Sequence, residues 1–354
     1  MDKRTLSLLL TCGKLSFDEL ARLFSLPRIE RPLRIPFSLD LITDDTDIWE
    51  WFRSTRENIY RLRILLKVPD VVRLENRSRF DGEEILCILL GRLCYPVRYT
   101  TMKLLFRRTK PELSMAFTWM LEHIDYNYGY LLTSLDLCWL RREDMSRFSR
   151  AIHEQGAPLR DIWAFIDGTF RPCCRPKRDQ KTLYSGHYRL HGLKFQSVMA
   201  PNGSVVNLDG PWPGRRHESG MLAESGLLTA LHTKMNNIGR TFRLYGDPAY
   251  PVAEYLEGPF RNGAQAVSQV EADFNEAMAS VRIAVEWGFG EVVQQWAFVD
   301  YSKNLKVLWQ PVGTFYSVAT LLLNCRVCLG HGGKVSDFFG VAPPTIEQYL
   351  NNQL

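Results

Sequence analysis

Hydrophobic positions follow two different periods along this chain. From about Trp49 to about Arg150 they recur at helical spacing. The segment RENIYRLRILLKV shows this stripe, with apolar side chains at Ile59, Leu62, Leu65 and Leu66. From about Ile162 they form short extended runs bounded by turn residues. The pattern predicts a helical region followed by an α/β region.

We expect four parts. Residues 1–48 contain two short helical patches broken by prolines at 27, 32 and 36, and we assign them no function. Residues 49–155 are predicted to form an all-α domain, and residues 156–335 an α/β domain. Residues 336–354 form a C-terminal tail.

Three consecutive helices are predicted before the α/β region. Asp81 and Glu84 have the spacing of a capping box ahead of EEILCILLGRLCY, which Pro96 ends. TTMKLLF follows, and Thr109 caps the next helix, with Pro111 in its first turn. The last two helices and their tight basic turn have the spacing of a helix-turn-helix. Any helical bundle contains such pairs, so DNA binding and plain bundle packing are favoured equally.

The α/β region has a recognisable order of elements. The hairpin is the clearest of them, because Asn202-Gly203 between two extended runs is a strong turn signal. The predicted elements are a strand at 162–167, hairpin strands at about 192–200 and 204–208, a helix at about 217–232, a strand at 241–246, and then helices. Strand, hairpin, helix, strand, helix is the outline of a ribonuclease H-like domain, a mixed sheet flanked by helices.

Three acidic residues occupy telling places in this outline. Asp167 and Asp247 each follow an apolar run that reads as a buried strand, and each precedes a turn residue. Glu286 lies on a predicted helix that begins with a capping-box spacing at Asp273 and Glu276. Carboxylates from two strand ends and a helix can converge on divalent metal ions, and two ions can drive in-line phosphodiester chemistry. The pattern predicts a metal-dependent nuclease.

Two further polar residues share the helix face of Glu286. Asn275 and Arg282 fall on that face at positions i−11 and i−4, so we expect them beside the substrate. The alternative is an exposed Arg282–Glu286 pair that contributes only about 0.3–0.5 kcal/mol to stability.

Charge is unevenly distributed along the chain. The net charge is only +5 over 354 residues, yet the segment 171–194 holds seven basic residues and one acidic residue. The basic residues in it are Arg171, Arg175, Lys177, Arg178, Lys181, Arg189 and Lys194. A basic segment directly after a candidate metal carboxylate suits a DNA backbone, although a solvated loop would show the same composition.

The composition, with 45% apolar and 23% charged residues, is that of an ordinary globular protein. No apolar stretch reaches the roughly 18 residues needed to span a membrane, and the N-terminus lacks the pattern of a signal peptide. Eight cysteines without a disulfide framework suit a reducing compartment. CRPKRDQK resembles a small nuclear-import signal, so we expect a nuclear or a cytoplasmic protein.

Cys173, Cys174, His187 and His191 invite a zinc interpretation. A zinc finger needs its cysteines two to four residues apart, and adjacent cysteines do not meet that pattern. His187 is expected either to flank substrate phosphates or to pack on the sheet. Cys325 and Cys328 lie in an apolar helical run and are expected to pack in the core.

The order and spacing of several motifs resemble one nuclease family. FIDGTF, YSGHYRLHGLKFQ, APNG, GPWPGRRHES, LYGDPAY, VRIAVEWGFG and LLLNCRVCLG are similar to the DDE-type nucleases of the PIF/Harbinger transposase group and to Harbinger-derived nucleases. RFDGEEILCILLGRLCYP and the helix pair after it also look like the helical region of these proteins. The resemblance covers roughly residues 50–330.

This resemblance implies a catalytic, metal-binding triad of Asp167, Asp247 and Glu286, separated by 80 and 39 residues. It implies two Mg²⁺ or Mn²⁺ ions, cleavage of DNA, and in an active transposase strand transfer by the freed 3′-hydroxyl. It also implies short A/T-rich targets and a second, Myb-like DNA-binding partner protein. The oligomeric state stays open, with a homo-oligomer among the alternatives.

One departure from the family pattern concerns an accessory acid. The family usually has His-Asp-Ser where this chain has His217-Glu218-Ser219. If Glu218 assists a metal, the extra methylene changes its reach and the activity with it. If it only caps the following helix, little else changes.

Two other functions are compatible with the sequence. A domesticated protein that binds DNA or another protein without cleaving could retain the fold and all three acids. A hydrolase acting on RNA or RNA/DNA hybrids could use the same core.

Overall fold

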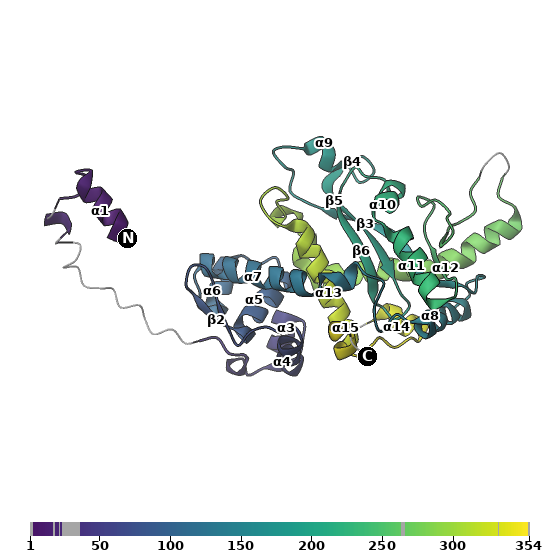
Figure 1. Ribbon diagram of the computed structural model, residues 1–354, viewed down its shortest axis with the longest axis horizontal. Coiled ribbons are helices and arrows are strands. Elements are labelled where there is room, and N and C mark those ends of the chain that lie inside the picture. Colours follow the sequence, from purple (N-terminus) through teal and green to yellow (C-terminus); the bar gives the residue numbers. More distant parts are fainter. Residues whose placement is uncertain are drawn as a thin grey trace. The chain divides into compact units, whose positions relative to one another are not determined.

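The computed structural model describes residues 3–16, 18–20, 22, 36–262, 266–331 and 333–352. The chain divides into two compact units, Met1–Pro36 and Phe37–Leu354 (Figure 1). The first unit contains helix α1 (Lys3–Thr11), while the predicted breaks at Pro27 and Pro32 lie outside the described residues. Among the described helices, none is both long and apolar enough to cross a membrane.

The second unit begins with helices that pack around α5 (Gly82–Cys94). Its N-terminal elements are η1 (Leu39–Leu41), α3 (Asp45–Phe52), α4 (Arg56–Leu65), β1 (Val71–Arg73), β2 (Arg79–Asp81), α5, α6 (Tyr99–Phe106), α7 (Lys110–Tyr128), η2 (Gly129–Leu132) and α8 (Arg142–Glu154). Strands β1 and β2 pair as an antiparallel ribbon. This part of the chain is therefore mainly helical rather than entirely helical.

Helix α5 is buried on every side, and Glu83 is its one partly exposed residue. The predicted capping box at its start is wrong. Asp81 stands at the N-cap position but its side chain makes no capping hydrogen bond. Glu84 is drawn instead into a buried ion pair with Arg108, whose Nε donates to Glu84 Oε1 at 2.7 Å.

The predicted helix pair after α5 is confirmed. Helices α6 and α7 are separated by residues 107–109, and Thr109 forms a capping box with Glu112, with a proline in the first turn. Helix α7 packs against α5 and α13 (Val312–Cys328). Use of this pair in DNA binding stays a prediction.

A six-stranded mixed sheet forms the centre of the α/β part. Its strands are β3 (Ile162–Pro172), β4 (Tyr184–Ser185), β5 (Leu190–Met199), β6 (Val205–Pro213), β7 (Arg243–Tyr245) and β8 (Leu256–Glu257). Strand β5 pairs antiparallel with β3, β4 and β6, whereas β7 pairs parallel with β3 and β8. The predicted mixed α/β sheet, its first strand and its hairpin are confirmed. Strands β4 and β8 are too short to show a period in the sequence.

The β5–β6 hairpin turns where the sequence indicates. Gly203 has φ +80°, a conformation that residues with a Cβ rarely adopt, and its N–H donates to Ala200 O at 3.0 Å. Asn324 of α13 supports the start of β6, because it accepts from Val205 N at 2.9 Å and donates to Val205 O at 2.8 Å. The hairpin is thereby joined to the buried helix α13.

Helices flank the sheet. They are α9 (Gln180–Leu183), α10 (Glu218–Glu224), α11 (Leu227–Ile238), α12 (Gln269–Gln295), η3 (Ala297–Asp300), η4 (Ser302–Asn304), α13, α14 (Lys334–Phe339) and α15 (Ile346–Asn351). The single helix predicted at 217–232 is two helices, because Gly226 at φ +70° interrupts it. Helix α12 begins earlier than predicted, with a capping box of Ser268 and Glu271. Asp273 instead accepts from Gln269 within the helix at 2.7 Å.

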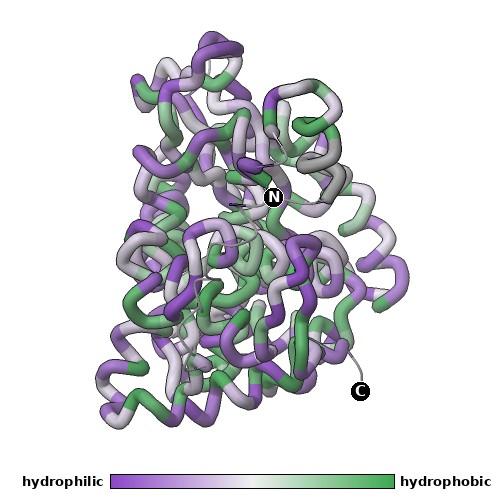
Figure 2. Tube along the Cα trace, turned by 90° about the vertical axis from the view of Figure 1, so that its left-hand side faces the viewer, coloured by the Kyte–Doolittle hydropathy of each residue, from purple (hydrophilic) through white to green (hydrophobic). Residues whose placement is uncertain are grey.

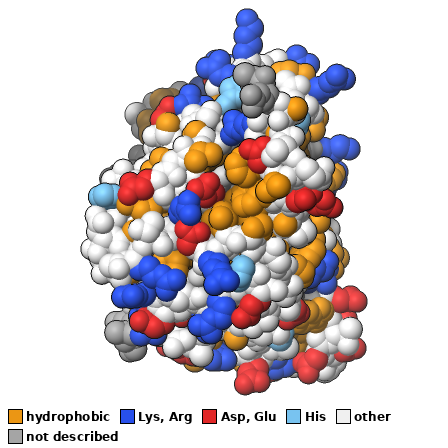
Figure 3. All heavy atoms as spheres, turned by 90° about the vertical axis from the view of Figure 1, so that its right-hand side faces the viewer, with side chains coloured by type: hydrophobic (Ala, Val, Ile, Leu, Met, Phe, Trp, Pro, Cys, Tyr) orange, Lys and Arg blue, Asp and Glu red, His pale blue; other side chains and the backbone are white. Residues whose placement is uncertain are grey.

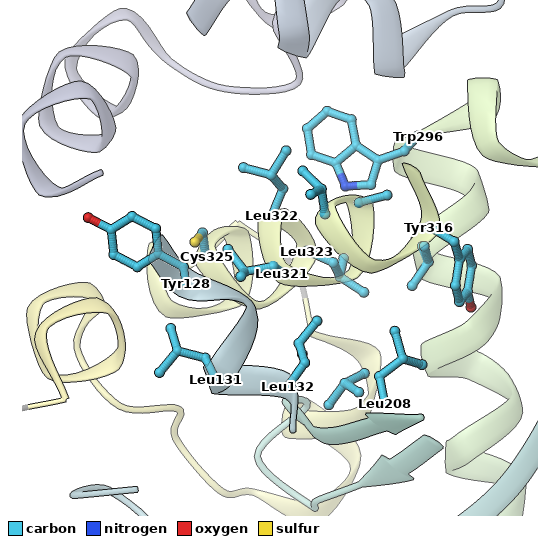
Figure 4. Close-up of a cluster of buried hydrophobic side chains, with 14 of the residues drawn as sticks. Tyr128, Leu131, Leu132, Leu208, Trp296, Tyr316, Leu321, Leu322, Leu323 and Cys325 are labelled. Atoms are coloured by element: carbon cyan, nitrogen blue, oxygen red, sulfur yellow. The ribbon is translucent and has the colours of Figure 1, made fainter. Parts of the chain in front are cut away.

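The hydrophobic core is continuous between the helical part and the sheet. Figure 4 shows side chains of α13, including Leu321 and Cys325, beside Tyr128 and Leu131 of the helical part and Leu208 of β6. Hydrophobic and hydrophilic segments alternate along the trace (Figure 2). On the face shown in Figure 3, acidic and basic side chains are interspersed with hydrophobic ones. All eight cysteines are free thiols, and Cys325 is fully buried, as core packing requires.

Candidate active site

Two adjacent parallel strands bring Asp167 and Asp247 together. Phe165 of β3 lies opposite Tyr245 of β7, and each aspartate is two residues beyond its member of this pair. Together with Glu218 and Glu286 of α12, they line one cavity of about 950 Å³. We call this the acidic cavity. Within the part of the chain that the structure describes, however, no three His, Cys, Asp or Glu side chains are arranged to hold a metal ion.

Arg282 joins two of the three predicted catalytic acids. Its Nη1 donates to Asp167 Oδ2 at 3.0 Å, and its Nη2 lies 3.7 Å from Glu286 Oε1. The i, i+4 pair expected from the helix is therefore only half of its interactions, because the guanidinium also reaches across to β3. One cation partly neutralises two carboxylates that would otherwise repel each other.

Both aspartates have raised pKa values. The pKa of Asp167 is raised to about 6, chiefly by burial and also by Asp247 and Glu286. Arg282 and the Gly168 N–H, at 2.8 Å from Asp167 Oδ1, act in the opposite direction and limit the rise. Burial also raises the pKa of Asp247, although the Ala249 N–H donates to its Oδ1 at 3.0 Å. Carboxyl groups with raised pKa values in a cavity are typical of functional sites.

Glu218 is a fourth carboxylate in the acidic cavity. It lies in the first turn of α10, whose N-cap is His217, and its Oε1 accepts from Lys194 Nζ at 2.7 Å. Gly168 permits this position, because a Cβ there would approach Glu218 Cγ to 3.1 Å. Glu218 therefore faces the cavity beside Asp167 instead of occupying the N-cap position.

The predicted DNA-binding residues fall into two groups. Arg171, His187, Lys194 and Arg282 line the acidic cavity. Arg171 is already engaged, since its guanidinium donates to Thr169 and lies 3.4 Å from Asp300. The residues outside the lining are Arg175, Lys177, Arg178, Lys181, Arg189 and Asn275.

Asn275 has a structural contact away from the cavity. Its Oδ1 accepts from the Phe260 N–H and its Nδ2 donates to Phe260 O, both at 2.9 Å. These two bonds hold the segment after β8 against α12. The helix-face argument placed Asn275 correctly relative to Glu286, but eleven residues of helix separate them by about 16 Å.

The cavity also contains residues that the sequence did not single out. Arg215 lines it, is exposed, and forms no ion pair with any described residue. Tyr188 lines it as well and stacks on Phe170 with ring centroids 4.5 Å apart. Both lie within motifs that carry the family resemblance, GPWPGRRHES and YSGHYRLHGLKFQ. Membership of these motifs was the sequence signal that could have identified them.

Adjacent Cys173 and Cys174 do not form part of a metal cluster among the described residues. Cys173 is buried, and Cys174 Sγ lies 3.3 Å from Lys303 O. His191 contacts the ring of Tyr184 edge-on at 5.3 Å.

Comparison with known proteins adds one finding. A family model for DDE superfamily endonucleases matches residues 166–324. The matched span includes Asp167, Asp247 and Glu286 and all other residues that line the acidic cavity. No curated protein and no solved structure matches the chain significantly. Residues 166–324 of this protein are thus similar to DDE superfamily endonucleases, and the mixed sheet flanked by helices is consistent with that similarity.

Proposed function

We propose that this protein is a metal-dependent DNA endonuclease of the PIF/Harbinger transposase type. The observation that carries the proposal is the acidic cavity, in which acids from two parallel strands and one helix meet inside the region that matches DDE endonucleases. The order of the elements, with a strand, a hairpin, helices, a strand and a long helix, supports a ribonuclease H-like core.

The donor set suits Mg²⁺ or Mn²⁺. Asp167, Asp247 and Glu286 offer only carboxylate oxygens, which are the ligands these hard cations prefer. We propose that these three residues hold two ions, with Glu218 as an accessory acid. The bound ions would activate a water molecule and stabilise the leaving oxygen of the scissile phosphate.

The cations of the cavity have a separate role in this proposal. Arg215 is available to a substrate phosphate, and Arg282 can exchange its carboxylate contacts for one. Lys194 keeps Glu218 in place, and Tyr188 forms an aromatic wall. These residues would bind and orient the DNA backbone, because their positive charges attract its phosphate groups.

Three further properties belong to the proposal. Two come from the Harbinger resemblance, and the third, nuclear location, comes from CRPKRDQK, which resembles a nuclear-import signal. The 3′-hydroxyl released by cleavage would attack target DNA in a strand-transfer step. A Myb-like partner protein would contribute to DNA recognition, and the protein would act in the nucleus.

The test is nicking of labelled duplex DNA, of random and of A/T-rich sequence, in Mg²⁺ or Mn²⁺. We expect wild type to cleave and Asp167→Asn to lose about a thousandfold in rate, because several kcal/mol of transition-state stabilisation depend on the ions. Asp179→Asn is the matched control, since Asp179 is exposed and lies outside the acidic cavity. Equal cleavage by wild type and Asp167→Asn would overturn the proposal.

Calorimetry with Mn²⁺ provides the second measurement. Wild type and Asp179→Asn should bind the ion, whereas Asp167→Asn should not. If wild type neither cleaves DNA nor binds Mn²⁺, the nuclease proposal fails and a non-cleaving binding protein replaces it.

A further inference from the structure

Two loops next to the sheet form a second cavity. Residues 174–177 and 306–310 line it, and its volume is about 560 Å³, within the usual range of ligand sites. The loops are tied together, because the Cys174 N–H donates to Leu305 O at 2.9 Å. In Figure 1 the segment before α9 and the segment before α13 lie at the same end of the sheet. We call this site the Trp309 cavity.

Uncompensated positive charge surrounds the Trp309 cavity. Residues 174–181 and 303–310 hold six basic side chains and one acidic side chain, a net charge of +5. Arg175 donates to Gln180 at 2.9 and 3.1 Å, and Lys177 and Lys306 form no ion pair within the described ranges. The acidic cavity differs, because its lining holds four Asp or Glu and four Lys or Arg side chains. The Trp309 cavity is therefore suited to phosphate groups.

The Trp309 indole stands exposed on a hydrogen-bonded turn. Its side chain is 81% exposed, and that of the neighbouring Leu308 is 49% exposed. The turn is held because the N–H groups of Trp309 and Gln310 donate to Lys306 O at 2.9 and 3.0 Å, and Gln310 Oε1 accepts from Lys306 N at 3.2 Å. Buried Leu305 anchors it to the core. An exposed aromatic ring among cations is the arrangement that stacks nucleobases.

We propose that the Trp309 cavity binds an unpaired nucleobase on Trp309, with its flanking phosphates on Arg175, Lys177 and Lys306. That the strand is DNA rests on the proposed function, whereas the stacking site is a property beyond duplex cleavage. Asp167 and Arg175 are eight residues apart, so their Cα atoms are at most about 29 Å apart. The acidic cavity and the Trp309 cavity are therefore close enough for one DNA strand to reach both.

The experiment compares two labelled DNAs by fluorescence anisotropy in EDTA, a blunt duplex and the same duplex with a single-stranded 3′ overhang. Trp309→Ala should weaken binding of the overhang DNA about tenfold, because loss of one stacked base has roughly that effect. Its affinity for the blunt duplex should not change. Trp309→Phe should restore most of the loss, since an aromatic face remains.

The cations should give a different signature. The double variant Lys177→Gln/Lys306→Gln should bind both DNAs more weakly. It should also reduce the slope of log affinity against log salt by about 2, one unit for each phosphate contact. Trp309→Ala should leave that slope unchanged. Tyr126→Ala, at an aromatic that is 89% exposed elsewhere, and Lys334→Gln, at an exposed lysine elsewhere, are the controls.

Equal binding of the overhang DNA by wild type and Trp309→Ala would overturn the inference, as would an equal loss on both DNAs. A change in self-association without a change in DNA affinity would overturn it in favour of a protein contact. The nuclease proposal is judged separately by cleavage and Mn²⁺ binding. Normal cleavage with unaltered Trp309→Ala binding therefore removes only this inference, and Trp309-dependent binding without cleavage or Mn²⁺ binding removes only the nuclease.

Discussion

Arg108 in the helical part and Arg282 in the acidic cavity each hold two carboxylates, but in different surroundings. Arg108 is 8% exposed, with its Nε 2.7 Å from Glu84 Oε1 and its Nη1 3.8 Å from Glu112 Oε1. It also donates to Arg79 O at 2.6 Å and lies 3.8 Å from the ring centroid of Phe80. The guanidinium is enclosed by protein partners on several sides.

The interactions of Arg282 are incomplete by comparison. It is 21% exposed and pairs with Asp167, which is 16% exposed, and with Glu286, which is 59% exposed. All three line an open cavity, and the pKa of Asp167 stays raised in spite of the arginine. Removing one partner of a buried, fully paired charge destabilises the fold, whereas an incompletely compensated cluster at a cavity is available for ligands and chemistry.

The largest expected effect is on stability, when the buried Arg108–Glu84 pair is broken. Arg108→Met leaves the Glu84 carboxylate buried without its main partner, so the free energy of unfolding should fall by about 3–5 kcal/mol. Chemical denaturation measures this, with Arg107→Met as the exposed neighbouring control. Adding Glu84→Leu should recover most of the loss. Equal free energies of unfolding for Arg108→Met and Arg107→Met would show that the Arg108–Glu84 pair does not contribute to stability.

Removing the charge of Asp167 in the acidic cavity should stabilise the fold, whereas removing Arg108 destabilises it. Because the folded pKa of Asp167 is raised from 3.8 to about 6, the folded protein keeps a proton that the unfolded chain releases. This contribution to the free energy of unfolding is present below pH 3.8 and is lost as the pH rises through 6. The loss amounts to about 3 kcal/mol.

Urea unfolding in EDTA at pH 4 and pH 7 measures this effect. Asp167→Asn cannot titrate at this position, so its free energy of unfolding should exceed that of wild type at pH 7. When the pH is lowered from 7 to 4, its free energy of unfolding should rise less than that of wild type. The difference between the two proteins cancels the contributions of other groups, and Asp179→Asn controls for a change of surface charge. A less stable Asp167→Asn at pH 7 would mean that Arg282 compensates the aspartate fully.

A smaller effect is expected on ion binding. Arg282→Gln removes the cation that shares Asp167 and Glu286, so Mn²⁺ should bind about tenfold more tightly, since a unit charge at about 4 Å contributes roughly 1–4 kcal/mol. Arg215→Gln is the matched control, because Arg215 lines the same cavity without an ion pair to any described residue. Calorimetry measures both. Weaker binding by Arg282→Gln would assign the arginine a supporting role.

The smallest effect belongs to an exposed pair of good geometry. Arg61 donates through Nε and Nη2 to Glu347 Oε1 at 2.8 and 2.6 Å, and the side chains are 46% and 42% exposed. Arg61→Gln should change the free energy of unfolding by less than about 1 kcal/mol, because water screens the pair. Arg150→Gln, at an exposed arginine, is the control in the same denaturation measurement. A loss comparable to that of Arg108→Met would show that geometry matters more than burial.

Local features of the sequence were sufficient where the signal lies within a few residues. The turn at Asn202-Gly203 and the Thr109 cap are confirmed because backbone preference and capping chemistry act over such distances. The same reasoning failed at Asp81 and at the start of α12, where competing partners were available. Glu84 had Arg108 as a partner, and Ser268 offered a capping box before Asp273.

By itself the sequence determined the class of the fold, the helix pair, the hairpin and the three acids as candidates, because these follow from periodicity, turn residues and motif order. Only the tertiary structure decided how those acids are compensated. The contact between Arg282 and Asp167 spans 115 residues, and Lys194 meets Glu218 across 24. The two loops of the Trp309 cavity are joined over a similarly long distance in the chain. Pairings of this kind depend on strand register and helix packing, which no local pattern encodes.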